Sequence, residues 1–507
     1  PAPAYSSTSS STISLKSGFD FKSASTSPRL AAAFVRAIER LKGSGAFAAD
    51  GLDSVTVSIS SLDETLAFGV DESYELNITG GSAATISSAT LYGALHALET
   101  FVQLADEYGP VAQENLQVPA EIHIRDAPRF AWRGLMIDTA RHYYPVPFIK
   151  HIIDTMAYVK LNVLHVHWTD DQSFPIESSK WPKLSSEGAF KDPHGHPLTY
   201  THSNLTDLVD YARDRGVLVV PEIDMPAHTS AWGAGYPEYM AQVSGKLFSH
   251  GDALRPDLDE TYTFLDSLLG EFAALFPTSE FLHLGGDELP KTAWAGNETV
   301  AAWMKAKGFD NDAAMAYFVN RVKAGPQLVA ASKTLVYWEE VFTSAGPQLP
   351  KDTVVQAWKS NAMPGAIAAG HRVTNSYKWY LNHGCNNYGD GLWQDFYENE
   401  PFDFVPQGTP PEQLARIVGG ETTMWAECVD TIIFDAIVWL RTAAAAEKLW
   451  SPQNATANAT ANVVERLAEA RCRLVSRGVR AAPLNDGSDV VKPGVSTPAR
   501  TFVGGCI

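Results

Sequence analysis

Residues 281–288, which read FLHLGGDE, decide both the fold and the chemistry expected of this chain. Apolar residues that alternate and end at two glycines predict a short buried strand. Gly285 and Gly286 permit a sharp turn, so Asp287 and Glu288 can face one cavity, although neighbours within a regular strand point apart. A single Gly-Asp-Glu sequence more often ends a strand with two solvated acids. The interpretation therefore depends on the other strand ends of the chain.

Strand and helix patterns alternate without a break from Trp132 onward. The predicted strands cover residues 135–137, 162–167, 217–220, 281–284, 335–338, 354–358, 373–377 and 417–425. Eight strand-then-helix units predict a closed parallel (β/α)8 barrel, the TIM barrel, with its active site at the carboxyl ends of the strands. The segment is longer than such a barrel needs, so extended loops are expected, notably between Asn382 and Glu412.

Residues 1–125 predict a smaller α+β domain that precedes a catalytic domain over residues 126–507, the barrel with a C-terminal tail. Helical spacing of apolar residues follows Pro28, and two segments around residues 55–59 and 74–78 alternate as half-buried strands do. The turn sequence at residues 126–128 marks the boundary. No catalytic side chains gather in this leading domain, so we expect it to pack against the barrel.

The composition limits the class of partner. The chain has 507 residues, 45% of them hydrophobic and 19% charged, with a formal net charge of -19. Nucleic acid or an anionic membrane surface would need a basic face, so neither is expected as a partner. No apolar run approaches the length of a membrane span.

Several features favour a secreted, extracellular protein over a lysosomal or vacuolar one. The chain opens at Pro1 with no signal-peptide pattern, as expected of a processed mature end. Asn-x-Ser/Thr glycosylation sequons begin at Asn77, Asn204, Asn297, Asn454 and Asn458. Four cysteines allow three disulfide connectivities and lack a zinc-binding Cys-x-x-Cys spacing. We expect Cys385 to pair with Cys428, and Cys472 with Cys506.

Side chains suited to sugar binding follow most of the predicted strands. In chain order they are Arg133, Asp170, Asp171, Asp224, His228, Asp287, Glu288, Trp338, Trp358, Tyr380, Trp425 and Glu427. Apolar sugar faces stack on indole rings while the hydroxyls bond charged groups, so tryptophan walls with carboxylates suit a carbohydrate. One tryptophan is more often core than ligand wall, but three at the rim of one barrel indicate a binding site.

These motifs resemble those of the family 20 glycoside hydrolases, the β-N-acetylhexosaminidases. The resemblance lies in residues 132–143 (WRGLMIDTARHY), 161–171 (LNVLHVHWTDD), 222–228 (EIDMPAH), 283–288 (HLGGDE) and 424–427 (MWAE). It extends to residues 91–95 (LYGAL) of the leading domain. Five motifs in the same order are far more specific than any one of them.

The resemblance implies exo-acting hydrolysis of terminal β-linked GlcNAc or GalNAc from chitooligosaccharides and glycans, with no cofactor or metal. The substrate's own 2-acetamido oxygen attacks the anomeric carbon and gives an oxazolinium ion, an exception to the scheme with two facing carboxylates. Glu288 acts as general acid and then as base, and Asp287 holds the acetamido N–H. His228, with Asp170 or Asp171, tunes the proton affinity of Glu288.

The remaining assignments by resemblance concern substrate binding and assembly. Tyr380 bonds the acetamido oxygen, while Trp338, Trp358 and Trp425 enclose its methyl group. Arg133 and Glu427 bind ring hydroxyls, and Asn382 stands where many relatives have aspartate, which affects contacts to the outer hydroxyls. Similar enzymes are commonly dimers, so a homodimer is expected. Ala227 and Ala426 also depart from the family pattern, but neither touches a proposed catalytic atom.

Two other classes of protein fit parts of the sequence. His165 and His167 lie on one side of a strand close to Asp170 and Asp171, as in a metal-dependent barrel hydrolase. That class leaves the tryptophan ring unexplained. A sugar-binding barrel without activity is the other alternative, and the presence of both Asp287 and Glu288 argues against it.

Overall fold

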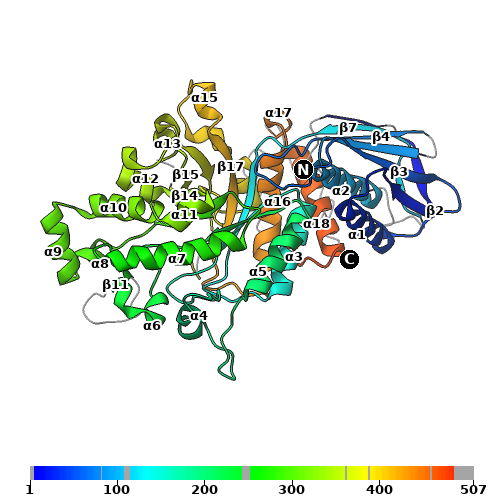
Figure 1. Ribbon diagram of the computed structural model, residues 1–507. Coiled ribbons are helices and arrows are strands. Elements are labelled where there is room, and N and C mark those ends of the chain that lie inside the picture. Colours follow the sequence, from blue (N-terminus) through cyan, green and yellow to red (C-terminus); the bar gives the residue numbers. More distant parts are fainter. Residues whose placement is uncertain are drawn as a thin grey trace.

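The computed structural model describes residues 5–8, 10–80, 83–107, 115–241, 252–359, 362–385, 389–456 and 460–484. It consists of a barrel and a smaller α+β domain that lie side by side, with the C-terminal helices between them (Figure 1). In the described part of the chain, no helix is long and apolar enough to cross a membrane.

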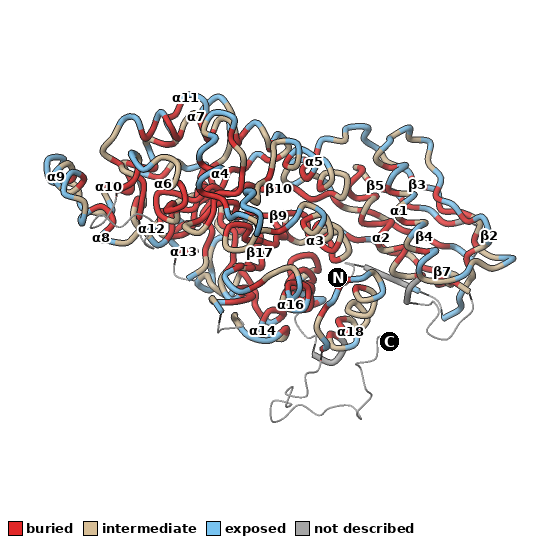
Figure 2. The backbone as a smooth tube through the Cα atoms, turned by 90° about the horizontal axis from the view of Figure 1, so that it is seen from below, coloured by how far each residue is buried: buried red, intermediate tan, exposed pale blue. Residues whose placement is uncertain are grey.

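The barrel is closed and all its strands are parallel, in the order β10-β13-β14-β15-β16-β17-β8-β9. The strands are β8 (Trp132–Asp138), β9 (Val163–His167), β10 (Leu218–Glu222), β13 (Phe281–His283), β14 (Thr334–Trp338), β15 (Val354–Ala357), β16 (Arg372–Asn375) and β17 (Ile417–Met424). The predicted TIM barrel and its preceding α+β domain are confirmed. Nearly every strand residue is buried, as parallel strands covered on both faces require (Figure 2).

Helices surround the barrel and carry its connections. The main ones are α3 (Val146–Tyr158), α5 (His202–Arg213), α7 (Asp259–Leu275), α10 (Asn311–Lys323), α12 (Glu339–Ala345), α13 (Met363–Ala369) and α16 (Phe434–Trp450). Local sequence sets their starts: Thr201 and Asn204 form a capping box at α5, and Asp310 caps α10 by accepting from the Ala313 N–H. The expected long loop after Asn382 is present and contains α14, η3 and α15.

Shorter elements fill the other connections. They are α4 (Lys183–Gly188), α6 (Trp232–Gly235), η1 (Pro237–Tyr239), β11 (Met240–Ala241), β12 (Ala253–Leu254), α8 (Lys291–Ala295), α9 (Glu298–Lys307), α11 (Pro326–Ala331), η2 (Gly346–Gln348), α14 (Trp393–Glu398), η3 (Pro401–Phe404) and α15 (Pro411–Leu414). After α16 come α17 (Gln453–Thr456) and α18 (Thr460–Ser476).

The leading domain is a seven-stranded sheet of order β1-β7-β4-β5-β3-β2-β6 with two helices. Its elements are β1 (Tyr5–Thr8), β2 (Thr12–Lys22), α1 (Pro28–Ser44), β3 (Leu52–Ile59), β4 (Tyr74–Thr79), β5 (Ala83–Ser88), α2 (Leu91–Glu107), β6 (Gln117–Pro119) and β7 (Glu121–Asp126). Leu30, Ala37 and Leu41 of α1 pack with the sheet and α2 in one apolar core. Trp450, the last residue of α16, belongs to this core too, so the C-terminal part of the chain joins the two domains.

Aromatic residues of the leading domain close the end of the barrel where the strands begin. The Phe68 ring meets those of Trp132 and Phe281 at centroid distances of 6.0 and 5.1 Å. Leu66 and Tyr92 belong to the same apolar cluster. The leading domain therefore seals the end of the barrel opposite to the expected active site.

Arg133 lies at this sealed end, and the prediction that it binds substrate is wrong. Its guanidinium is fully buried and forms two bonds with the Glu72 carboxylate, at 2.6 and 2.9 Å. Its Nε–H donates to the Lys160 carbonyl, and its guanidinium carbon lies 4.9 Å from the Trp450 ring centroid. As the sequence pattern indicates, Arg133 lies at the beginning of the first strand, β8 (Trp132–Asp138), which is the end of the barrel opposite to the expected active site.

The disulfide between Cys385 and Cys428 is present, with 5.1 Å between the Cα atoms. It ties the segment after Tyr380 to the segment after Trp425. The other predicted pair includes Cys506, which lies outside the described residues, so that pairing stays a prediction.

The sequons occupy different environments. Asn77 and Asn204 are half-buried in β4 and α5, Asn297 caps α9, Asn454 is exposed in α17, and Asn458 lies outside the described residues. The Oδ1 atoms of Asn204 and Asn297 accept backbone N–H bonds. Their occupancy stays a prediction.

Replacing Arg133 with methionine should destabilise the protein by about 3–5 kcal/mol, because it leaves the buried Glu72 carboxylate without its partner. Denaturant unfolding at neutral pH measures this loss. Arg125→Met is the matched control, since its ion pair with Glu75 is exposed and such pairs contribute about 0–1 kcal/mol. A raised KM with unchanged stability in Arg133→Met would instead support substrate contact.

Candidate active site

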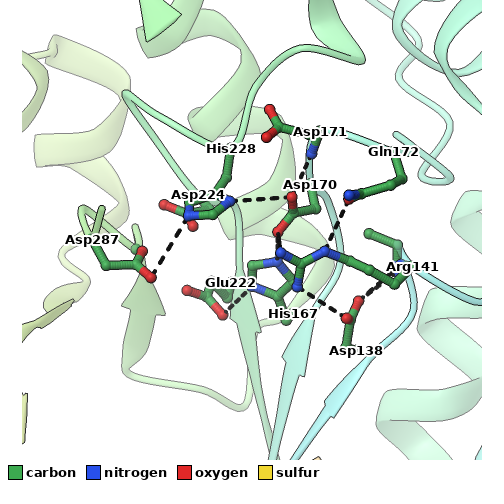
Figure 3. Close-up of polar contacts among 12 residues, drawn as sticks. Asp138, Arg141, His167, Asp170, Asp171, Gln172, Glu222, Asp224, His228 and Asp287 are labelled. Carbon is green, nitrogen blue, oxygen red and sulfur yellow. Dashed lines mark hydrogen bonds and ion pairs between the residues drawn. The ribbon is translucent and has the colours of Figure 1, made fainter. Parts of the chain in front are cut away.

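Polar side chains converge where the barrel strands end (Figure 3). Asp138 ends β8, His167 ends β9, Glu222 ends β10, and Asp287 and Glu288 follow β13. Asp170, Asp171, Asp224 and His228 come from the loops after β9 and β10. This is the face that the barrel topology predicts for an active site.

Two glycines place the adjacent acids, as the sequence predicts. Gly285 and Gly286 have φ values of +63° and +95°, which side chains with a Cβ rarely adopt. A Cβ at Gly285 would also overlap the Asp224 carboxylate, and one at Gly286 would overlap Val341. The Gly286 N–H donates to Asp224 Oδ1 at 2.9 Å, which fixes the turn.

Asp287 and Glu288 lie in opposite environments although they are neighbours. Asp287 is only 7% exposed, and burial raises its pKa to about 6. Glu288 has a side chain that is 57% exposed, and the nearby His228 lowers its pKa. Glu288 and His228 both have positive φ, at 50° and 56°, a strained state that clusters at functional sites.

His228 connects these acids to Asp170. Its Nδ1 lies 3.2 Å from Asp170 Oδ1, and its Nε2 lies 3.6 Å from Glu288 Oε2 and 3.8 Å from Asp287 Oδ2. Burial alone would lower the pKa of His228, but the carboxylates of Asp170 and Asp287 hold it well above its ordinary value. His228 therefore lies among three carboxyl groups that favour its protonated form.

Of the two predicted aspartates, Asp170 is the one that bonds His228. Asp171 Oδ1 accepts the Ser230 N–H at 2.9 Å and the Ser230 hydroxyl at 2.7 Å, which fixes the loop that carries His228. Asp224 is buried beside Asp287, and burial followed by the charge of Asp287 holds its pKa well above the ordinary value.

Arg141 is a site residue to which the strand pattern alone gives no role. Its guanidinium bonds Asp170 Oδ2 at 2.7 Å and Asp138 Oδ2 at 3.1 Å, and its carbon lies 5.1 Å from the Trp425 ring centroid. Asp138 also accepts the Ala426 N–H, so the ends of β8 and β17 are joined. The sequence signal that could have identified Arg141 is its position three residues after the end of the first strand.

The predicted aromatic residues come together beside the acids. The Trp338 and Trp425 centroids are 6.0 Å apart, and Trp358 stacks on Tyr380 at 5.7 Å with 22° between the rings. Tyr380 lies 6.5 Å from Trp425. These rings lie at the ends of β14, β15 and β17 and in the segment after β16.

Carboxylates orient two of these tryptophans. Trp338 Nε1 donates to Glu222 Oε1 and Trp358 Nε1 donates to Glu340 Oε2, both at 2.9 Å. Glu340 has no role in the sequence pattern, because its contact is visible only when β14 and β15 lie side by side.

Asn382 holds Trp425 in place, and its predicted contact with the sugar stays a prediction. Its Nδ2 donates to the Trp425 carbonyl at 2.7 Å, and its Oδ1 accepts the Trp425 N–H at 3.0 Å. Both amide atoms are thereby used to fix Trp425. Glu427, two residues later, is exposed at the rim. Its contact with ring hydroxyls stays a prediction.

His165 and His167 face the barrel interior together, as strand alternation predicts. Each imidazole lies between two carboxylates: His165 between Glu222 and Glu421, and His167 between Glu222 and Asp170. This hydrogen bonding gives both histidines a structural task and accounts for the His-x-His pattern without a metal-hydrolase role.

Comparisons with known proteins agree with this geometry. The model of the glycosyl hydrolase family 20 catalytic domain matches residues 130–453, and a model described as beta-acetyl hexosaminidase like matches residues 39–104. Beta-hexosaminidase 3 of Arabidopsis thaliana is 40% identical over 449 residues, 87% of this chain and 79% of the relative. Beta-hexosaminidase subunit beta of Homo sapiens is 36% identical over 450 residues, 86% of this chain and 77% of the relative.

Solved structures show the same fold. The Flavobacterium johnsoniae chitobiase matches with a TM-score of 0.80 and 31% identity, covering 94% of this chain and 72% of that one. The Streptomyces plicatus N-acetyl-beta-hexosaminidase in complex with Thio-NAglucal matches with a TM-score of 0.76 and 27% identity, covering 94% and 95%. The chain therefore belongs to glycosyl hydrolase family 20, as a glycoside hydrolase with β-hexosaminidase function.

Proposed function

We propose that this enzyme removes terminal non-reducing β-linked GlcNAc or GalNAc from chitooligosaccharides and glycans by substrate-assisted, retaining catalysis. The observation that carries the proposal is the contrast between Asp287 and Glu288. Among the described residues, Asp287 Oδ1 is buried and has no hydrogen-bond partner, so it is available to an acetamido N–H. Glu288 is exposed at the rim, where a glycosidic oxygen arrives.

The reaction follows from these positions. The acetamido oxygen attacks the anomeric carbon as the glycosidic bond breaks, and Glu288 gives its proton to the leaving oxygen. Asp287 accepts the N–H bond and stabilises the positive charge that develops on the oxazolinium ion. Glu288 then takes a proton from water as the water attacks the anomeric carbon and displaces the acetamido oxygen, which regenerates the acetamido group and restores the original configuration.

The protonation states fit this sequence of steps. In the free enzyme the nearby His228 lowers the pKa of Glu288, which suits its later role as base. A sugar that covers the half-exposed Glu288 removes water from it and so raises its pKa, which favours the acid form when substrate binds. Arg141 and Glu427 are the charged groups best placed to bind ring hydroxyls. Trp338, Trp358, Tyr380 and Trp425 enclose the acetamido group.

The cellular setting is a further part of the proposal. The Cys385–Cys428 disulfide and the sequons support an oxidising, extracellular location. The homodimer stays a prediction.

Replacing Glu288 with glutamine should lower kcat/KM by roughly 10²–10⁴ fold on glycosides with poor leaving groups, because these need the proton that Glu288 supplies. Activated aryl glycosides need little protonation, so their loss should be much smaller. Steady-state kinetics on chitobiose and an aryl GlcNAc glycoside measure the difference. The exposed Glu412→Gln serves as the control, and equal losses on both substrates would remove Glu288 from the acid role.

Asp287→Asn should lose activity and gain stability. In wild type, kcat/KM should rise as pH increases through about 6, where Asp287 ionises. A raised pKa means that the folded state favours the protonated form, so stability is lost as pH rises through the same range. Asparagine removes this buried charge and should stabilise the protein on the order of 1–3 kcal/mol at pH 8, with no gain at pH 4.

Unfolding curves at both pH values, and binding of a thiazoline mimic of the oxazoline, test this prediction. The exposed Asp207→Asn is the matched control. A variant that binds the thiazoline as tightly as wild type would contradict the role of Asp287. Efficient hydrolysis of the corresponding β-glucosides, which lack the acetamido nucleophile, would contradict the mechanism.

A further inference from the structure

A second imidazole lies directly behind Asp170. His167 Nε2 is 2.7 Å from Asp170 Oδ2, and His167 Nδ1 is 2.6 Å from Glu222 Oε2 (Figure 3). Both distances are short, as for charge-assisted hydrogen bonds. The ring is fully buried, so no water competes for either nitrogen.

These two contacts define the charge of His167. Carboxylate oxygens only accept hydrogen bonds, so each ring nitrogen must carry a proton and the ring is an imidazolium. Burial alone would lower the pKa of His167, but the charges and hydrogen bonds of Glu222 and Asp170 hold it well above its ordinary value. Burial alone would raise the pKa of Glu222, but the facing His283, His167 and His165 hold it well below its ordinary value.

The two oxygens of Asp170 divide their partners. Oδ1 faces His228, while Oδ2 faces His167 and Arg141. Rotating this carboxylate would break the contacts on both sides at once. The orientation of Asp170 toward His228 is therefore set from behind, by His167 and Arg141.

We propose that His167 is a positioning residue, which fixes the charge and orientation of Asp170 and, through Asp170, those of His228 and Glu288. The inference rests on the function proposed above. It extends the line Glu288–His228–Asp170 inward through His167 to Glu222, on the end of the neighbouring strand β10. His167 touches no reacting atom and acts through the residues in front of it.

The surroundings of His167 determine the sign of the expected change. The charged and titratable groups around it are Asp138 and Arg141 after β8, Asp170 and His165 on and after β9, Glu222, Asp224 and His228 on and after β10, and His283 on β13. The Trp425 ring packs edge-on at 5.0 Å. Removing the imidazolium deletes one positive charge from a group rich in carboxylates, so the pKa values of those carboxylates should rise.

His167→Gln tests the proposal, with His165→Gln as the matched control. His165 lies two residues earlier on the same strand, is equally buried and also bonds two carboxylates, but it does not contact Asp170. The acidic limb of the kcat/KM profile should move upward by roughly one pH unit in His167→Gln, the size expected for a lost nearby charge. In the His165→Gln control, the acidic limb should move by less than half as much, although the loss of stability should be comparable.

A double-mutant cycle supplies the second measurement. If His167 acts through Asp170 and His228, then His228→Gln should cost much less activity in the His167→Gln background than in wild type. Additive losses, or equal pH shifts in His167→Gln and His165→Gln, would overturn the proposal. Wild-type inactivity on aryl GlcNAc and GalNAc glycosides would instead overturn the proposed function.

If His167→Gln does not fold, nitrogen-15 histidine spectra of the wild-type enzyme decide the question. The expected result is that His167 carries protons on both ring nitrogens up to at least pH 8. A neutral ring in that range would contradict the proposal, because a neutral imidazole has only one donor for its two carboxylates. Single-histidine variants at other positions provide the assignment.

Discussion

The Glu222 carboxylate at the end of β10 is the interaction on which the rest of the site depends. One oxygen meets His165 and His167, and the other meets His283 and the Trp338 indole N–H. These partners come from β9, β13 and β14, so a single buried anion joins four strands inside the barrel. Burying a charge without such partners costs several kcal/mol, and here the imidazoles compensate for it. The same bonds orient the Trp338 ring and place His167 behind Asp170.

This arrangement explains how two adjacent carboxylates can have different tasks. The turn at Gly285 and Gly286 directs Asp287 into the buried group and leaves Glu288 at the rim. Burial then raises the pKa of Asp287 to about 6, while His228 lowers the pKa of Glu288. The chemical difference between them therefore arises from position, because the side chains alone have nearly equal acidity. Environments that separate two carboxyl pKa values are a common way to divide acid and base roles.

Much of the fold follows from local patterns, because apolar strands and amphipathic helices alternate from Trp132 to Trp450. The Gly-Gly-Asp-Glu turn can also be predicted from the sequence, since both positions require glycine because of their positive φ and their close neighbours. Arg133 shows where such reasoning fails: the resemblance implies a role in substrate binding, but its place at the start of β8 puts it at the end of the barrel opposite the acids. The roles of Asn382, Glu340 and Arg141 depend on partners far away in sequence, which periodicity does not reveal. The family motifs predict which residues come together, but only the structure shows the hydrogen-bond and ion-pair partners of each residue.

The central claim is that the substrate provides the nucleophile, which Asp287 and the aromatic residues hold in place. Aryl glycosides of GlcNAc whose N-acetyl group carries zero, one, two or three fluorines test it most directly. Fluorine withdraws electrons from the acetamido oxygen and weakens its attack without adding much volume. The account predicts that kcat/KM falls steeply along the series, by several orders of magnitude in total, since an intramolecular attack so placed contributes on the order of 7–11 kcal/mol. Rates that stay nearly constant across the series would show that the enzyme provides its own nucleophile, and would contradict the account.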